Sequence, residues 1–255
     1  MRVGIFGRHH DLAARLTAAG IEPLGCTAID GPRVDARTVD RLEDYLDALD
    51  HPRRFFLDVP AGAEVDALID RCYVVMEPGD VVVDPTPSYW GDTLRRFRRM
   101  RHRSIYYVDL ALIDSTTALL AGDARGVAIA MPLVERLVPA GGAARAGEAG
   151  AAHFALMIRA GVATAVAHAL GEARQLLEAY PNEPEPEAVM RLLWPAVAPA
   201  MPAAAWLLDD AVRLQAVIPL LAQGVMLEMG AALDDHRPVE VPPRVGGFVH
   251  PDDIL

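Results

Sequence analysis

The sequence predicts an α/β domain, with a parallel β-sheet covered by helices, followed by an all-α domain built on one long central helix. Over about residues 1–145, short apolar segments alternate with segments of helix-forming residues, which is typical of a parallel sheet with helices on both faces. After residue 145 helix formers dominate, and we expect no further strand. We place a sheet domain at 1–145, a helical domain at 146–236 and an irregular tail at 237–255.

Five apolar segments of the first half are the expected strands: Arg2–Phe6, Ile21–Cys26, Arg54–Val59, Asp80–Asp84 and Ser104–Leu112. The segments between them predict helices, which we expect at His10–Ala19, Thr38–Leu49, Ala63–Val75 and Asp92–Arg103. A weaker unit over Thr116–Val138 ends at a turn. The strand–helix–strand start is Rossmann-like, the arrangement found in dinucleotide-binding domains.

The helical domain is organised around Gly147–Ala179. We expect one long helix there, because helix formers dominate the segment and no proline interrupts it. Apolar residues recur on it at helical spacing: Phe154, Met157, Ile158, Val162, Val166 and Leu170. Small residues lie among them, so that neighbouring helices can approach closely. A helix that is apolar on most sides is buried, here as the pillar of a helical domain or the core of a dimer.

Charge and composition exclude several classes of function. The chain of 255 residues has a net charge of −11 and 52% hydrophobic residues, which disfavours general binding to nucleic acid or anionic membranes. We interpret the Arg-rich run Arg95–Arg103 as the solvated face of a helix. Cys26 and Cys72 are far apart and indicate neither a disulfide framework nor a metal site. Without a signal sequence or membrane span, a cytoplasmic protein is expected.

The basic residues other than histidine are all arginine. The sequence contains no lysine, and its single asparagine is Asn182. Proton transfer or Schiff-base chemistry by lysine is therefore excluded for this chain. Arginine cannot take over the role of a base, because its guanidinium stays protonated at any working pH.

Several motifs carry a resemblance to a known family. They are Gly150-Ala-Ala-His153-Phe154-x-x-Met157-x-x-x-Gly161 on the long helix, together with Leu57–Pro60, Pro78–Arg96, Ile105–Asp109 and Leu214–Pro219. Together they resemble the 6-phosphogluconate dehydrogenases and, more widely, the β-hydroxyacid dehydrogenases. The resemblance is strongest over residues 52–175. It implies a small-molecule ligand in a cleft between the two domains, and a homodimer in which long helices of two subunits pack together.

The catalytic positions of that family are replaced in this sequence. The family's central helix carries a lysine base, followed by His, Asn, Glu and Tyr residues that hold the substrate. Leu156 stands at the position of the lysine, and the four substrate positions correspond to Arg159, Ala160, Ala163 and Thr164. The family's hydride transfer is therefore not expected.

The dinucleotide fingerprint is also incomplete. It needs glycines for a tight turn, for close approach of the pyrophosphate and for helix–strand packing. Gly7 keeps the first position, whereas His9 and Leu12 occupy the other two. Thr27 stands where an acidic residue grips the ribose, with Asp30 nearby. We expect no cofactor, and NAD(P) only if this atypical loop still binds it.

The loop after the first strand keeps two alternatives open. With Gly7, the side chains of Arg8, His9 and His10 form the residual cofactor loop, which either holds a phosphate at the helix N-terminus or is simply solvated.

At Asp84–Ser88 the family has Asp-Gly-Gly-Asn-Ser, and its glycines and asparagine become Pro85, Thr86 and Pro87. The remaining Ser88 is interpreted as a helix cap. Asp114 either faces the cleft or caps the next helix.

Three functions remain open. The first, which we favour, is a repurposed enzyme with a non-redox reaction on a small, possibly anionic metabolite. Its candidate catalytic residues are Asp58, Asp114, His153 and Arg159, with His9 or His10. His153 equally fits a core histidine, and Arg159 either binds a carboxylate or phosphate or forms an ion pair. The second is a non-catalytic homologue that binds a ligand or a partner protein. The third is an NAD(P)-dependent reductase with an atypical phosphate loop, as in imine reductases.

Overall fold

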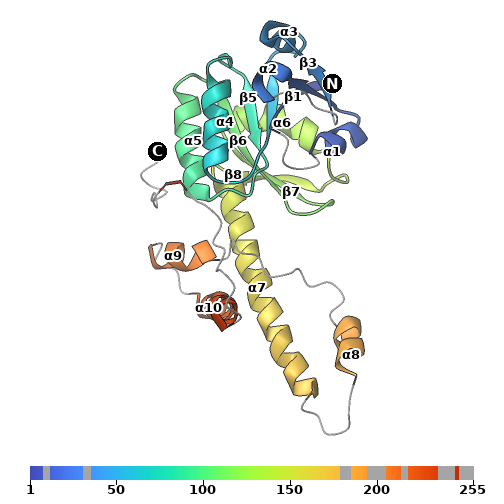
Figure 1. Ribbon diagram of the computed structural model, residues 1–255, viewed down its shortest axis with the longest axis vertical. Coiled ribbons are helices and arrows are strands. Elements are labelled where there is room, and N and C mark those ends of the chain that lie inside the picture. Colours follow the sequence, from blue (N-terminus) through green and yellow to red (C-terminus); the bar gives the residue numbers. More distant parts are fainter. Residues whose placement is uncertain are drawn as a thin grey trace. The chain divides into compact units, whose positions relative to one another are not determined.

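The computed structural model describes residues 1–7, 12–30, 36–178, 185–193, 205–213, 218–234 and 245–246 (Figure 1). The chain divides into two compact units. The sheet unit comprises Met1–Leu156 together with Pro243–Leu255, and the helical unit comprises Met157–Pro242. The chain therefore leaves the sheet unit once, builds the helical unit and returns to the sheet unit at its end.

The sheet unit is built on one eight-stranded sheet with the order β3-β2-β1-β4-β5-β6-β7-β8. Its strands are β1 (Arg2–Gly7), β2 (Glu22–Cys26), β3 (Arg37–Val39), β4 (Arg54–Asp58), β5 (Val81–Asp84), β6 (Tyr106–Leu112), β7 (Ala118–Gly122) and β8 (Ala143–Gly147). Neighbouring strands from β3 to β6 are all parallel. Apolar residues are buried on both faces of the inner strands β1, β4, β5 and β6, as parallel sheets require, whereas the edge strand β3 has no buried residue. The predicted fold class is confirmed.

Three features of the sheet differ from the sequence prediction. The helix expected at Thr38–Leu49 is replaced at its start by β3, which pairs with the end of β2, and only α3 (Leu42–Asp47) is helical. Strand β7 runs antiparallel to β6, because the link of residues 113–117 is too short for a parallel crossover. Strand β8 was not expected, since its alanines, arginine and glycine have little β-propensity. It is held by pairing with β7.

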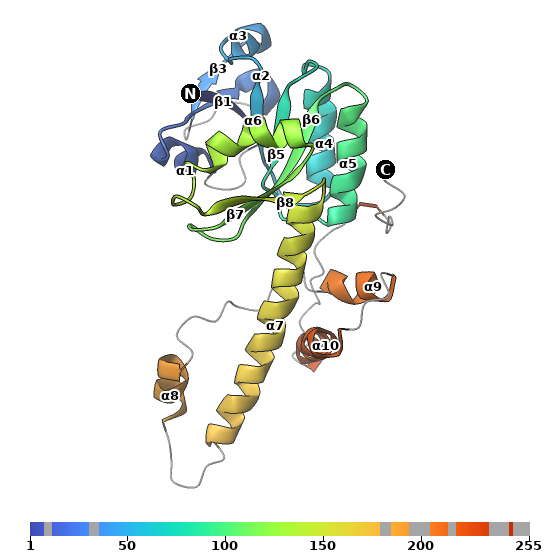
Figure 2. The same ribbon diagram turned by 180° about the vertical axis from the view of Figure 1, so that it is seen from behind.

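Helices cover both faces of the sheet. On one face lie α3, α4 (Ala63–Tyr73) and α5 (Trp90–Arg101), which pack on Phe55 and Tyr107. On the other face lie α1 (Leu12–Ala18) and α6 (Ala124–Val134). Figure 1 shows α4 and α5 side by side in front of the sheet, and Figure 2 shows α6 crossing the opposite face. A short helix, α2 (Thr27–Asp30), follows β2.

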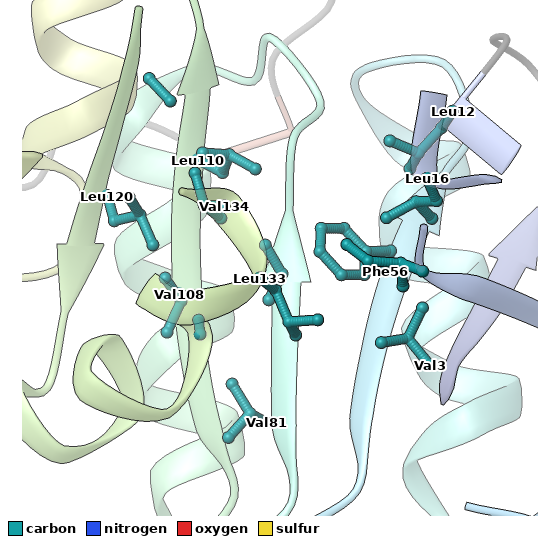
Figure 3. Close-up of a cluster of buried hydrophobic side chains, with 14 of the residues drawn as sticks. Val3, Leu12, Leu16, Phe56, Val81, Val108, Leu110, Leu120, Leu133 and Val134 are labelled. Atoms are coloured by element: carbon teal, nitrogen blue, oxygen red, sulfur yellow. The ribbon is translucent and has the colours of Figure 1, made fainter. Parts of the chain in front are cut away.

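The second face is closed by a continuous apolar cluster. Leu16 of α1 and Leu133 of α6 meet Phe56 and Val108 of the sheet there (Figure 3). All four side chains are fully buried. Burying side chains of this size contributes roughly 1.5–3 kcal/mol each, so this packing sets the positions of the strands that carry the candidate site.

The helical unit contains most of α7 (Ala151–Glu178), with α8 (Pro186–Leu193), α9 (Ala205–Arg213) and α10 (Pro219–Asp234). Other helices approach α7 closely, as its small residues predicted. A Cβ atom added to Gly161 would lie 2.6 Å from Leu207 of α9, and one added to Gly224 of α10 would lie 2.7 Å from the Cα of Ala165.

The long helix is not buried on every side within one chain. Ile158, Val162 and Val166 remain 38%, 46% and 42% exposed. Among the described residues, Ala151–Gly171 is the one segment long and apolar enough to cross a membrane by length and composition, and 33% of its most apolar window is buried. A single helix of this kind is weak evidence for a membrane protein, because core helices of soluble proteins pass the same test.

Candidate functional site

Three buried aspartates lie toward the carboxyl ends of neighbouring strands, the edge at which parallel sheets bind ligands. Asp58 ends β4, Asp84 ends β5, and Asp109 on β6 pairs in register with Asp84. None is more than 1% exposed. Asp109 had not been singled out from the sequence, although its place in an apolar strand offered a signal.

The strand order reverses between β1 and β4, which makes this the switch point of the sheet. Gly7 ends β1 here and pairs with Asp58. Its φ is 86°, and an added Cβ would lie 2.3 Å from the main-chain oxygen of Asp58. Only glycine fits this turn without strain, so the first position of the dinucleotide fingerprint keeps its backbone geometry.

Asp109 holds the first turn of α7. Its carboxylate accepts hydrogen bonds from the N–H groups of Gly150 (2.9 Å), Ala152 (3.0 Å) and His153 (3.2 Å). Such N–H groups have no partner within a helix, and the helix dipole favours a negative charge beside them. Burial raises the pKa of the Asp109 carboxyl, while the His153 ring and these N–H groups act in the opposite direction.

His153 is 1% exposed, and both of its ring nitrogens lie within hydrogen-bond distance of a partner. Nε2 lies 3.2 Å from the main-chain oxygen of Asp84, and Nδ1 lies 2.7 Å from Thr93 Oγ1. A carbonyl oxygen only accepts, so Nε2 carries a proton that it donates to Asp84, while Nδ1 shares a hydrogen bond with the Thr93 hydroxyl. This geometry gives His153 the role of a core histidine that joins α7 to β5.

The side chain of Asp84 begins a second set of contacts. It accepts from the Thr86 N–H at 2.9 Å and from the Tyr107 hydroxyl. Arg96 Nη1 lies 3.9 Å from Asp84 Oδ2. Burial, together with the nearby Asp84 charge, raises the pKa of Tyr107 well above its usual value. Tyr107 is therefore a neutral hydrogen-bond donor at any physiological pH.

Arg96 extends this set across α5 and is 1% exposed. It donates to Ser88 Oγ at 2.9 Å, to the Gly62 main-chain oxygen at 3.0 Å and to the Asp66 carboxylate at 3.1 and 3.2 Å. Burial alone would lower the pKa of Arg96. The nearby Tyr107 side chain, the hydrogen bond to Asp66 and the charges of Asp84 and Asp66 outweigh burial and raise this pKa. The pKa of Asp66 is lowered, since hydrogen bonds from Arg96 and Arg95 outweigh its own burial.

These contacts correct two sequence interpretations. The run Arg95–Arg103 is not wholly a solvated helix face, because Arg96 points into the interior and is held by buried partners. Ser88 does not cap α5 through its side chain: Tyr89 is the N-cap residue and makes no side-chain cap bond. Instead, the Ser88 hydroxyl accepts from Arg96.

Asp114 was expected in a cleft or at a helix start, and it lies in the exposed turn between β6 and β7. Its Oδ1 accepts from the N–H and hydroxyl of Thr116, both at 2.7 Å, and from the Thr117 N–H at 2.9 Å. No helix follows this turn, because the chain enters β7. Asp114 thus stabilises a hairpin turn through its own neighbouring backbone.

The remaining candidates are distributed over both units. Arg159 is half-buried on α7 in the helical unit. Arg8, His9, His10 and the side chain of Asp30 lie outside the described residues.

At the expected ribose position, the Thr27 hydroxyl lies 2.8 Å from Asp40 Oδ1 and 3.1 Å from the main-chain oxygen of Val39. Asp40 thus places a carboxylate next to the end of β2. The sequence did not indicate it, because Asp40 follows β3 and not β2. Among the described residues, no group of three or more His, Cys, Asp or Glu side chains is placed to hold a metal ion.

Parts of the sequence are similar to 6-phosphogluconate dehydrogenases. No protein-family model matches the chain. A decarboxylating 6-phosphogluconate dehydrogenase of Bacillus licheniformis is 36% identical over 81 residues, which cover 32% of this chain and 17% of that protein. An NAD(+)-dependent 6-phosphogluconate dehydrogenase of Bacillus subtilis is 29% identical over 147 residues, 53% of this chain and 31% of that protein. The chain thus spans less than a third of the length of these two relatives.

Solved structures share the fold over nearly the whole chain. A 3-hydroxyisobutyrate dehydrogenase of Mycobacterium tuberculosis, solved with L-serine, has a TM-score of 0.69 at 17% identity and covers 91% of this chain and 94% of that one. An imine reductase of Myxococcus stipitatus, a variant in complex with NAD+, has a TM-score of 0.55 at 16% identity, with coverage of 92% and 77%.

Proposed function

From its place in the family of 6-phosphogluconate dehydrogenases and related β-hydroxyacid dehydrogenases, to which the chain belongs, we propose that it uses the family scaffold for a non-redox role. In this proposal the protein no longer transfers hydride with NAD(P) and acts on a small anionic metabolite. Arg159 of the helical unit is the candidate residue for binding the anion, and Asp58 of the sheet unit is the candidate acid or base.

The hydrogen bonding of His153 is the observation that carries the proposal. The family's His on this helix is kept, but its two ring nitrogens are engaged by Thr93 and by the backbone of Asp84. A general base must be able to exchange a proton with the substrate, and this ring has no nitrogen to spare. The sequence offers no lysine in its place.

The rate expected to be lost with the family's general base also supports the absence of hydride transfer. A positioned general base contributes roughly 10²–10⁴-fold to the rate. Here Leu156 stands at the lysine position of the family, and Ala160 and Ala163 replace polar substrate ligands. One replacement can be repaired by a neighbouring group, but replacement of the base together with several substrate ligands removes the machinery of the reaction.

The ligand class follows from charge. Arg159 is a permanent cation on α7 and can bind a carboxylate or phosphate with two parallel hydrogen bonds. Asp58 is 1% exposed at the switch point of the sheet, where ligands of parallel sheets bind. A small carboxylated or phosphorylated metabolite suits a permanent cation such as Arg159, and a homodimer is the assembly in which we expect the protein to act.

Binding of such metabolites tests the proposal. Thermal unfolding of the full chain is followed with 6-phosphogluconate, 3-hydroxyisobutyrate, L-serine and inorganic phosphate. We expect stabilisation by at least one of them, lost in Arg159→Ala and kept in the matched control Arg191→Ala, an exposed arginine of α8. An equal response of both variants would reject Arg159. Asp58→Asn should keep binding and lose turnover; full binding with no turnover in any form would favour a non-catalytic binding protein.

Two observations keep an NAD(P)-dependent reductase as the second candidate. Gly7 retains the positive φ that the tight turn of a dinucleotide fingerprint requires, and it lies against the backbone of Asp58. Asp40, beside Thr27, also supplies a carboxylate next to the end of β2. Oxidation of NADPH with a cyclic imine as substrate would favour this candidate over the first.

A further inference from the structure

Asp92, in the first turn of α5, receives two backbone donors from the far end of the chain. Its carboxylate accepts from the Val245 N–H at 2.6 Å and from the Gly246 N–H at 2.5 Å. The two residues follow Asp92 by 153 and 154 positions in the sequence. Asp92 is 1% exposed, whereas Val245 is 48% exposed. Asp92 therefore lies in the interior of the sheet unit, whereas Val245 lies on its surface.

The chemistry of Asp92 requires a partner of this kind. A buried carboxylate without hydrogen bonds is costly, and bonds from N–H groups to an ionised carboxylate are stronger than neutral ones. Arg95 Nη2 lies 3.5 Å from Asp92 Oδ1 and supplies a further positive charge. Gly246 is suited to the contact, because an added Cβ would lie only 3.0 Å from Asp92 Oδ1.

The path of the chain gives this contact a consequence. The chain leaves the sheet unit through the first turn of α7, which Asp109 and His153 hold, and it returns at Pro243 after the helical unit is complete. Asp92 holds the returning segment. The next residue of α5, Thr93, is the hydrogen-bond partner of His153. The outgoing and the returning chain are thus fastened at adjacent residues of α5.

We infer that Val245–Gly246 is a strap anchored by Asp92, and that these two bonds hold the returning end of the chain on the sheet unit. The strap belongs to the same chain. Because its two bonds end on one carboxylate, a single side chain controls whether the strap is held. Asp92 acts as a positioning residue, since it holds the strap.

Hydrogen exchange of the full chain, read by mass spectrometry, tests the strap. In Asp92→Ala we expect the backbone amides of Val245 and Gly246 to exchange about tenfold faster or more, because two charge-assisted bonds are lost. Val245→Pro removes one donor and leaves α5 unchanged, so Gly246 should lose protection there too. The control is Ser88→Ala, which removes a bond to Arg96 in α5 without touching the strap, and should leave Gly246 protected.

The outcomes separate the alternatives. Unchanged exchange at Gly246 in both variants, with folding intact by circular dichroism, would overturn the inference. Protection that rises with protein concentration would assign the strap to a second copy and would also overturn it. If Asp92→Ala does not fold, Val245→Pro alone decides, since it changes only the strap.

Discussion

The Nε2–H of His153 donates to the main-chain oxygen of Asp84 over 3.2 Å and so joins the first turn of α7 to the end of β5. In a family whose chemistry takes place near this helix, a histidine at this point suggests a proton shuttle. Its second nitrogen is occupied by Thr93. The ring therefore connects α7 to β5 in the interior, and its removal should lower the free energy of unfolding.

Replacement of His153 by alanine should destabilise the fold. It removes two buried hydrogen bonds and leaves a cavity, and together these effects cost about 2–4 kcal/mol. Urea unfolding followed by circular dichroism measures the change. His102→Ala, at an exposed position after α5, is the matched control and should stay within about 0.5 kcal/mol. An equally small change in the free energy of unfolding of His153→Ala would contradict the structural role of His153.

Replacement of Arg96 should destabilise the fold as much as replacement of His153. Arg96→Met keeps much of the side-chain volume but leaves Asp84 and Asp66 without their buried cation. Breaking a buried ion pair on one side typically costs about 3–5 kcal/mol. Arg101→Met, on the exposed side of the same helix, should cost little. Equal unfolding midpoints of the two variants would show that the Arg96 network does not support the fold.

Asp109 predicts a pH dependence of stability. Burial raises the pKa of its carboxyl above the unfolded value, so the folded state binds a proton that the unfolded state releases in the window between the two values. The free energy of unfolding should therefore fall as the pH rises from about 4 through that raised pKa. In Asp109→Asn this component should vanish. The two curves of unfolding free energy against pH would then differ in slope over this window, and parallel curves would reject the raised pKa.

Asp114 should matter to the turn and not to ligand binding. Asp114→Ala removes three hydrogen bonds within an exposed turn, for which we expect a loss of about 0.5–1.5 kcal/mol. Any ligand found by thermal unfolding should bind the variant as tightly as the native chain, by calorimetric titration. A binding defect without a folding defect would return Asp114 to the functional site.

The sequence predicted what periodicity controls and missed what pairing and burial control. Apolar runs such as Val81–Asp84 and the helical spacing of α7 act locally, so the sheet and the long helix could be derived. Strand β8 exists because β7 lies beside it, and no local pattern records that neighbour. Likewise, Arg96 follows Arg95 in an evenly charged run, and only the position of Asp66 and Ser88 on other elements decides that Arg96 is buried.

The candidate site divides in the same way. His153 and Asp58 were recognisable because they lie in segments that resemble motifs of the family. The partners that define their chemistry, Thr93 and the backbone of Asp84, are distant in sequence and carry no motif of their own. The helix that Asp114 was expected to cap is absent, because the short link after β6 leads into β7.

The central claim, that this scaffold no longer serves hydride transfer, is tested most directly by titrating the purified chain with NADPH and NADH while nucleotide fluorescence is followed. We predict no saturable binding in the micromolar range, and no reduction of NADP+ or NAD+ with 6-phosphogluconate or 3-hydroxyisobutyrate by absorbance. Saturable binding at micromolar concentration, accompanied by turnover of either hydroxy acid, would contradict the account.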